Sequence, residues 1–175
     1  MRRRARENMS IEAHLSKHKK SLAGQWFDLL AGSYPLETVR LLKKETDQFA
    51  NPVGHTFAAA IEAIIEEFLG ENRPEVMRPL LDRIIGIRAV QEFSPSSALA
   101  FIFDFKEIAR GAIEEERAAG SVSVEELSGF DRKVDGLTLL AFDVYMDRRQ
   151  KLFDVRMGEL KNRTSRLIDL VNRER

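Results

Sequence analysis

The chain has 175 residues, 43% of them apolar, which suits one domain built around a single core. It contains no cysteine, and this excludes disulfides, thiolate nucleophiles, zinc fingers and cysteine-ligated clusters. The net charge is zero, no stretch approaches about 18 consecutive apolar residues, and no apolar signal core follows the start, so we expect a cytoplasmic protein without a membrane span.

The balance of charge changes along the chain. Residues 1–20 carry seven Lys or Arg against two Asp or Glu, and residues 147–175 carry nine against five, whereas residues 21–146 carry twelve against twenty-one. Basic ends occur in proteins that touch nucleic acid, anionic membranes or acidic proteins, and also in solvated tails. No motif supports nucleic-acid binding, which we do not expect. We expect a disordered basic tail over 1–10, a helical domain over 11–146 and an extension of the last helix over 147–175.

Apolar residues recur at helical spacing through the first half of the chain. This spacing predicts helices over residues 11–32, 35–45, 52–70 and 74–91. Asn51 supplies an N-cap and Pro52 a favourable first position for the third of these helices. Pro79 favours a later start for the fourth, because proline is poorly tolerated inside a helix.

The next helix is predicted to begin at Ser94 and Pro95, where the serine side chain caps the first turn and the proline occupies the first position. Its apolar stripe includes Phe101 and Phe105. Phe103 broadens this stripe, and the width predicts a central helix in the core.

The last helix is predicted to begin at Ser123 and Glu126, which have the spacing of a capping box. No proline follows, so the helix is expected to run for nearly fifty residues, with Gly136 as the place for a bend. The first part of this helix is expected to pack on the domain through Leu137, Leu139, Leu140, Phe142, Val144 and Tyr145. Since no segment alternates like a strand, the chain is predicted to be all-α, a helical bundle with a long C-terminal amphipathic helix.

The end of this helix carries a heptad seam, in which side chains recur every four and three residues. The seam consists of Phe153, Met157, Leu160, Thr164, Leu167 and Val171. An isolated helix gains little by exposing such a seam, so another helix is expected to cover it. We favour a homodimer, because a helix of about 30 residues extends about 45 Å, further than a small domain can readily cover. The alternative is an ordinary C-terminal helix folded back on its own domain.

Motifs for catalysis are absent from the sequence. It contains no glycine-rich phosphate loop, nucleophile elbow, kinase signature or Glu-x-x-His pair, so we expect no enzymatic activity, no cofactor and no metal. His14 and His18 are four residues apart, but two ligands make an incomplete metal site. They are interpreted as surface histidines.

Five residues are candidates for contact with a ligand or a partner protein: His55, Arg88, Gln91, Phe101 and Phe105. His55 lies in the first turn of the third helix and either faces solvent or enters a pocket formed with Phe57, Phe101 and Phe105. Gln91 belongs to the corner that precedes Ser94. Arg88 lies next to the buried stripe of the fourth helix, so it either pins this corner internally or meets a partner protein or an anionic ligand.

Two blocks resemble a known family. They are "KKETDQFANPVGHTF", from Lys43 to Phe57, and "RAVQEFSPSSA", from Arg88 to Ala98. Both are similar in order and separation to the N-terminal sensory domain of the RsbRD type, found in co-antagonists of the stress-signalling kinase RsbT. The resemblance covers roughly Leu15 to Glu116. It implies an all-helical, globin-related module without haem, which dimerises and leads through a long exit helix into a phosphorylatable STAS domain.

The chain ends at Arg175, so we expect a stand-alone version without the STAS domain, and no phosphorylated residue is carried over. Stand-alone versions occur in anaerobic sulfur-metabolising bacteria, where the family is associated with electron-transfer genes. The resemblance therefore implies a non-enzymatic signalling module that acts as a dimer on a partner protein, such as a kinase or STAS-type regulator. The alternatives are a sensor that binds a small ligand or cofactor, and an accessory protein of an electron-transfer complex.

Overall fold

The computed structural model describes residues 10–44, 49–118 and 121–173, and no strand occurs within these ranges. Eight helices lie in the described residues: α1 Ile11–Ser16, α2 Lys19–Gly32, α3 Leu36–Lys44, α4 Pro52–Leu69, α5 Pro74–Val90, α6 Pro95–Ala112, α7 Glu114–Ala118 and α8 Val124–Arg173. The prediction of an all-α bundle with a long C-terminal helix is confirmed. The expected basic tail falls almost wholly on residues 1–9, which lie outside the described residues.

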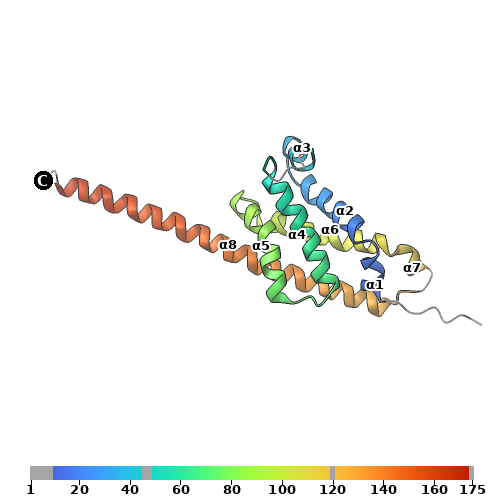
Figure 1. Cartoon of the computed structure of the whole chain (residues 1–175). Helices are drawn as coiled ribbons and strands as arrows, with labels where there is room; N and C mark the ends of the chain where they lie inside the picture. The colour runs from blue at the N-terminus through green and yellow to red at the C-terminus, as the bar shows by residue number, and fades with distance from the viewer. Residues whose placement is uncertain (1–9, 45–48, 119–120, 174–175) are drawn as a thin grey trace, which may run out of the picture.

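The body of the protein is formed by α2, α4, α5, α6 and the first half of α8, while α8 runs on alone beyond it (Figure 1). Within the body, α5 contacts α4 and α8, α2 contacts α4 and α6, and α6 contacts α8. Every described side chain from Phe153 to Arg166 is exposed. Among the described residues, no helix combines the length and the apolar character needed to cross a bilayer.

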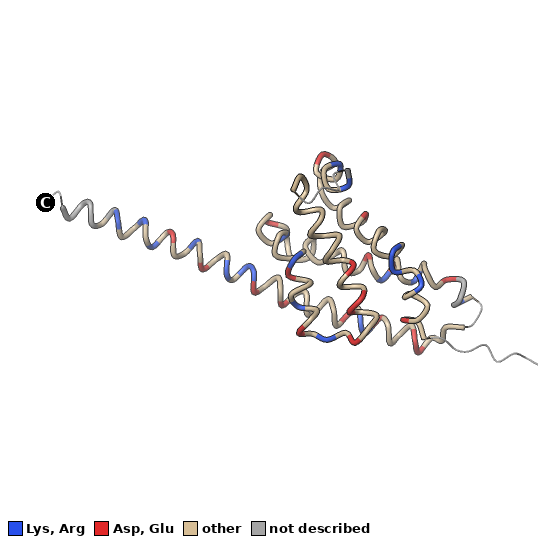
Figure 2. The backbone as a smooth tube through the Cα atoms, viewed as in Figure 1, with Lys and Arg blue, Asp and Glu red and all other residues tan. Residues whose placement is uncertain are grey.

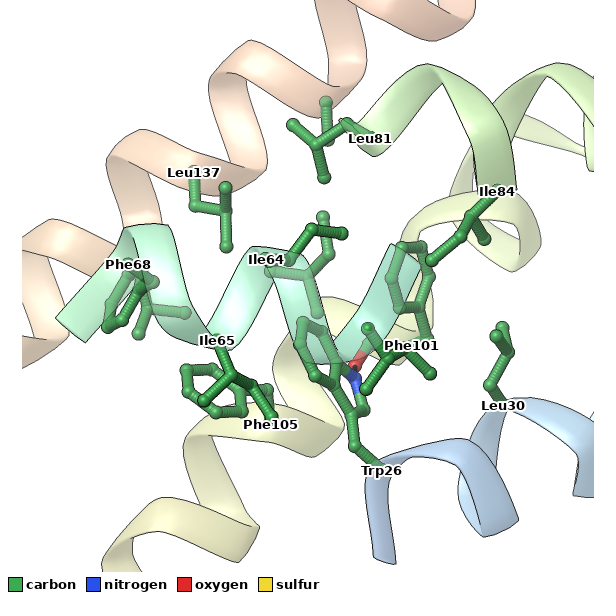
Figure 3. Close-up of a cluster of buried hydrophobic side chains, with 14 of the residues drawn as sticks. Trp26, Leu30, Ile64, Ile65, Phe68, Leu81, Ile84, Phe101, Phe105 and Leu137 are labelled. Carbon is green, nitrogen blue, oxygen red and sulfur yellow. Dashed lines mark hydrogen bonds between the residues drawn. The ribbon is translucent and has the colours of Figure 1, made fainter. Parts of the chain in front are cut away.

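The core is built around stacked aromatic rings (Figure 3). Trp26 of α2 stacks on Phe105 of α6 with ring centroids 4.6 Å apart, and its indole Nε1 donates a 2.5 Å hydrogen bond to the carbonyl oxygen of Phe101. Phe68 of α4 meets the Phe105 ring edge-on at 5.3 Å. Burying aromatic rings in such offset and edge-on pairs stabilises a core beyond the area that they remove from water. The prediction that Phe101 and Phe105 of α6 face the core is confirmed.

Side-chain caps fix three helix starts where the sequence predicts them. Asn51 Oδ1 accepts a hydrogen bond from the amide of Gly54 at the start of α4, and Ser94 Oγ accepts one at the start of α6. At the start of α8, the amide of Ser123 donates to Glu126 Oε2 and the amide of Glu126 donates to Ser123 Oγ, which completes the capping box. Local sequence therefore accounts for where α4, α6 and α8 begin.

The first predicted helix is divided in two. α1 ends at Ser16 and α2 begins at Lys19, because the amide of His18 bonds to the carbonyl of Leu15, three residues back, and tightens the turn. Leu15 and Leu22, on either side of this turn, are both buried. The prediction of one continuous helix over 11–32 is wrong. The apolar spacing of this segment is compatible both with one helix and with two helices joined by a turn, so it could not reveal the division.

Two expected interruptions do not occur. Pro79 lies within α5, where its missing amide removes only the bond to the carbonyl of Glu75 near the start of the helix. Gly136 lies within α8, which is helical from Val124 to Arg173 without a break. The long last helix is therefore a single rod.

Four side chains lie differently from expectation. Leu139 and Phe142 are exposed, because α8 turns Phe130, Val134 and Ala141 toward the core instead. Phe103 is exposed as well, because α6 turns Phe101, Ile102 and Phe105 toward the core. His14 was expected at the surface but is buried, and its Nδ1 lies 3.1 Å from the carbonyl oxygen of Ser10. The first part of α8 does pack on the domain, through Leu137, Val144 and Tyr145 with Leu140 partly buried. The expectation is wrong for Leu139 and Phe142, which leave an apolar face of α8 exposed.

Candidate functional site

The corner between α5 and α6 consists of residues Gln91, Glu92, Phe93 and Ser94. The amide of Phe93 bonds to the carbonyl of Arg88, and the amide of Glu92 bonds to the carbonyl of Ala89, which is the Schellman pattern that ends many helices. Glu92 has a φ of 64°, in the left-handed region that favours glycine. Surrounding contacts therefore hold this corner in a conformation that its own sequence disfavours.

Arg88 lies beneath the corner, in the last turn of α5, and is 1% exposed. Its Nη1 donates to Ser33 Oγ at 2.9 Å, and its Nη2 donates to the carbonyl oxygen of Ser97 at 2.7 Å. The guanidinium carbon lies 4.3 Å from the ring centroid of Phe93 and 5.4 Å from that of Tyr34. Arg88 thus joins the end of α2, the corner and the first turn of α6.

The charge of Arg88 is buried without an ion pair to any described carboxylate. Burial lowers the pKa of Arg88, and the nearby Tyr34 and Asp104 partly oppose this shift. Burial also raises the pKa of Asp104, an effect that Arg88 partly offsets. A guanidinium stays protonated in proteins, so the buried charge of Arg88 needs stabilising partners. The negative faces of the aromatic rings and the two oxygen acceptors provide them in place of a carboxylate.

Tyr34 ties the corner to the end of α2. Its hydroxyl donates a 2.9 Å hydrogen bond to Gln91 Oε1, and its ring lies 5.2 Å from that of Phe93. Burial raises the pKa of Tyr34, although Arg88 opposes the rise. The hydroxyl therefore stays protonated near neutral pH and remains a hydrogen-bond donor.

The corner also contacts α8 at the point where α8 leaves the body. The Tyr145 hydroxyl donates a 2.7 Å hydrogen bond to the carbonyl oxygen of Phe93, and Arg156 Nη2 lies 3.1 Å from Glu92 Oε1. The same stretch of α8 is bound to α5 by the pair of Arg148 with Asp82. The corner is therefore in direct contact with α8.

The other candidate residues are distributed between the core and the surface. Phe101 and Phe105 are buried against Trp26, as Figure 3 shows, and both are part of the core packing. His55 is exposed in the first turn of α4. An open groove of about 590 Å³ between α2 and α6 is lined by neither His55 nor these rings. In the described part of the chain, no group of three His, Asp or Glu side chains is placed to hold a metal ion.

The described part of the predicted heptad seam lies on the free end of α8. Phe153, Met157, Leu160 and Thr164 are exposed there, and Thr164 Oγ1 donates to the carbonyl of Leu160. The side chains of Leu167 and Val171 lie outside the described residues. Core contacts of α8 continue as far as Leu152, which is partly buried.

Sequence reasoning found Arg88 and Gln91 but missed Tyr34, Phe93, Tyr145 and Arg156. Tyr34 and Tyr145 reach the corner from residues 57 and 52 positions away, so no local spacing connects them. A usable signal was the scarcity of tyrosine, since the chain has only two, and buried tyrosines usually carry a hydrogen bond.

The family model described as the RsbT co-antagonist protein rsbRD N-terminal domain matches residues 20–159. The chain belongs to this family. Comparisons with curated proteins and with solved structures give no match. The matched part of the rsbRD N-terminal domain includes the corner, Tyr145 and Arg156, and it extends beyond the resemblance over Leu15 to Glu116 into the free end of α8. Both the pinned corner and the first seam residues therefore belong to the family domain, a stress-signalling regulatory domain.

Proposed function

We propose that this rsbRD N-terminal domain is a non-enzymatic regulatory module that works as a homodimer on a protein partner, a kinase or STAS-type regulator. The observation that carries the proposal is the exposed row of apolar side chains on the free end of α8, formed by Phe153, Met157 and Leu160. Large apolar side chains repeated on one helical face in water are typical of a surface that another helix covers.

The corner supplies the means of regulation in this proposal. Arg88 holds the corner in place through its hydrogen bond to the carbonyl oxygen of Ser97. The corner in turn is hydrogen-bonded to Tyr145 and Arg156 of α8. A small change at the corner would shift or roll α8, because packed helices move between discrete arrangements rather than deforming continuously. The partner would then read the position of the paired α8 helices.

The alternative of a ligand-binding sensor has less support. The rings of Phe101 and Phe105 contact Trp26 and Phe68, so side chains already fill the space next to them. The other alternative, that the protein is an accessory subunit of an electron-transfer complex, stays a prediction.

The proposal is tested by the mass of the full chain in solution. Sedimentation equilibrium of the wild-type chain at micromolar concentrations is expected to give twice the mass of one chain. The Leu160→Glu variant is expected to give the mass of a single chain. Val155→Glu is the matched control, because Val155 is 61% exposed on the opposite side of the same helix. A wild-type monomer, or a dimer that tolerates Leu160→Glu, would contradict the proposal.

A further inference from the structure

The apolar face of α8 is longer than the seam that the sequence predicts. Six apolar side chains, each between 42% and 70% exposed, form what we name the α8 stripe: Leu139, Phe142, Met146, Phe153, Met157 and Leu160. At about 100° per residue, all six lie within an arc of about 60° around the helix, and the stripe is about 32 Å long. The same apolar face therefore runs from the body onto the free end.

The body leaves this face open. Of the residues that α8 turns inward, Phe130 and Ala141 lie about 130° or more from the middle of the α8 stripe, and Tyr145 lies about 90° from it. Leu139, Phe142 and Met146 belong to the half of α8 that packs on α5 and α6, yet they point away from the core. A partner helix can thus reach the stripe along the body as well as beyond it.

The two flanks of the α8 stripe carry opposite charge. One flank holds Arg149, Arg156 and Arg163, spaced seven residues apart. The other flank holds Asp143 and Asp147, which both pair with Arg78 of the same chain, and then Asp154 and Lys161. Figure 2 shows both signs of charge along the free end of α8. A helix with one basic and one acidic flank is complementary to a second copy of itself.

The direction of pairing follows from these flanks. In a parallel pair, the basic flank of one helix faces the acidic flank of the other, and Arg149 and Asp154, five residues apart, hold positions that meet across the interface. In an antiparallel pair, the arginine flanks face each other. Arg156, which would approach Lys161 in the parallel pair, is already bound to Glu92 of its own chain. Charge therefore favours the parallel arrangement.

We propose that a second copy of this chain packs parallel and in register along the whole α8 stripe, so that the interface begins at Leu139 on the body. This inference rests on the proposed dimer and adds its direction and extent. Each stripe residue then meets its counterpart in the partner, and both corners lie at one level of the paired helices.

Cysteine cross-linking of the full chain tests this inference, because the natural sequence has no cysteine. Met146→Cys probes the body, Leu160→Cys probes the free end, and Val155→Cys is the control on the opposite face. Under mild oxidation, Met146→Cys and Leu160→Cys are each expected to form covalent dimers at least about tenfold faster than Val155→Cys, since a disulfide needs closely approaching Cβ atoms. Circular dichroism checks that each variant keeps its helices.

The alternative outcomes separate the inference from the proposed function. Cross-linking by Leu160→Cys alone would limit the interface to the free end and overturn the inference, although the dimer would stand. Co-expressed Met146→Cys and Leu160→Cys chains that cross-link only with each other would indicate an antiparallel pair, with the same consequence. No cross-linking together with a monomeric mass would overturn both.

Discussion

The Tyr145 hydroxyl donates its hydrogen bond to the carbonyl oxygen of Phe93, a residue of the corner between α5 and α6. This contact joins the helix that leaves the body to the corner that Arg88 holds in place. Phe93 is therefore held from two sides, by a guanidinium at its ring and by a phenol at its carbonyl.

Tyr145→Phe is expected to lower the free energy of unfolding by about 1 kcal/mol, because the Phe93 carbonyl loses its donor in a partly buried place. Urea unfolding followed by circular dichroism measures the change. Tyr34→Phe is the matched control, and its cost is expected to be smaller because Gln91 is exposed and water can replace the lost donor. Equal costs for the two substitutions would contradict this account of the corner.

Arg88→Lys is expected to lower the free energy of unfolding by about 2 kcal/mol, although the charge is kept. A lysine cannot donate to Ser33 and Ser97 in the same fork geometry or stack flat on Phe93. The same substitution at Arg83, which is exposed on the same helix, is expected to be nearly neutral. Thermal unfolding of both variants provides the comparison, and a neutral Arg88→Lys would show that the forked contacts contribute little.

Glu92→Gly is expected to give a more stable protein than Glu92→Ala, by about 1 kcal/mol. Both variants lose the contact with Arg156, so they differ only in the side-chain carbon that is unfavourable at a φ of 64°. Denaturant unfolding of the two variants isolates this backbone effect. Equal stability of the two would indicate that the corner changes its conformation when Glu92 is replaced.

Trp26→Phe is expected to lower the free energy of unfolding by about 2 kcal/mol, through a smaller ring and the loss of the bond to the Phe101 carbonyl. Since the chain has one tryptophan, circular dichroism must replace fluorescence as the probe of this variant. Phe27→Leu, at a partly buried neighbour on α2, is the control and is expected to cost less. A cost below that of the control would contradict the central place of Trp26.

Glu67 makes the stability of the protein depend on pH in acid solution. Hydrogen bonds from the side chain and backbone amide of Arg73 lower the pKa of Glu67 from 4.5 to about 2. Because the folded pKa lies below the unfolded one, the stabilising effect is fully present above pH 4.5 and is lost as the pH falls toward 2.

Glu67→Gln is therefore expected to flatten the pH dependence of the free energy of unfolding between pH 4.5 and 2. Glu62→Gln, at an exposed position of the same helix, serves as the control and is expected to leave the slope nearly unchanged. Urea unfolding at several pH values gives both slopes. An unchanged slope in Glu67→Gln would show that the contact with Arg73 is not maintained in solution.

Local signals in the sequence predicted the helix starts well. Asn51, Ser94 and the pair of Ser123 and Glu126 each bond within three residues, so their chemistry is complete in a short stretch of sequence. The division at His18 was not predicted, because apolar spacing continues across it. The exposure of Leu139 and Phe142 was also missed, since spacing identifies an apolar face but not which of two faces meets the body.

Only part of the candidate site could be predicted from the sequence. Arg88 could be placed beside the buried stripe of α5, but its acceptors on Ser33 and Ser97 come from two other helices. Tyr145 and Arg156 join the corner only after α8 has docked on the body. These partners depend on tertiary packing, which residue spacing along one chain does not encode.

The unbroken course of α8 beyond Tyr145 bears on how the proposed regulation would work. A straight helix with all its backbone hydrogen bonds is torsionally stiff, so a roll at Tyr145 turns Leu160 through nearly the same angle. A hinge between Tyr145 and Leu160 would interrupt that rotation, and α8 has no break in this stretch. Under the proposed function, a small rotation of α8 at the body would therefore reach its free end without an intervening break in the helix.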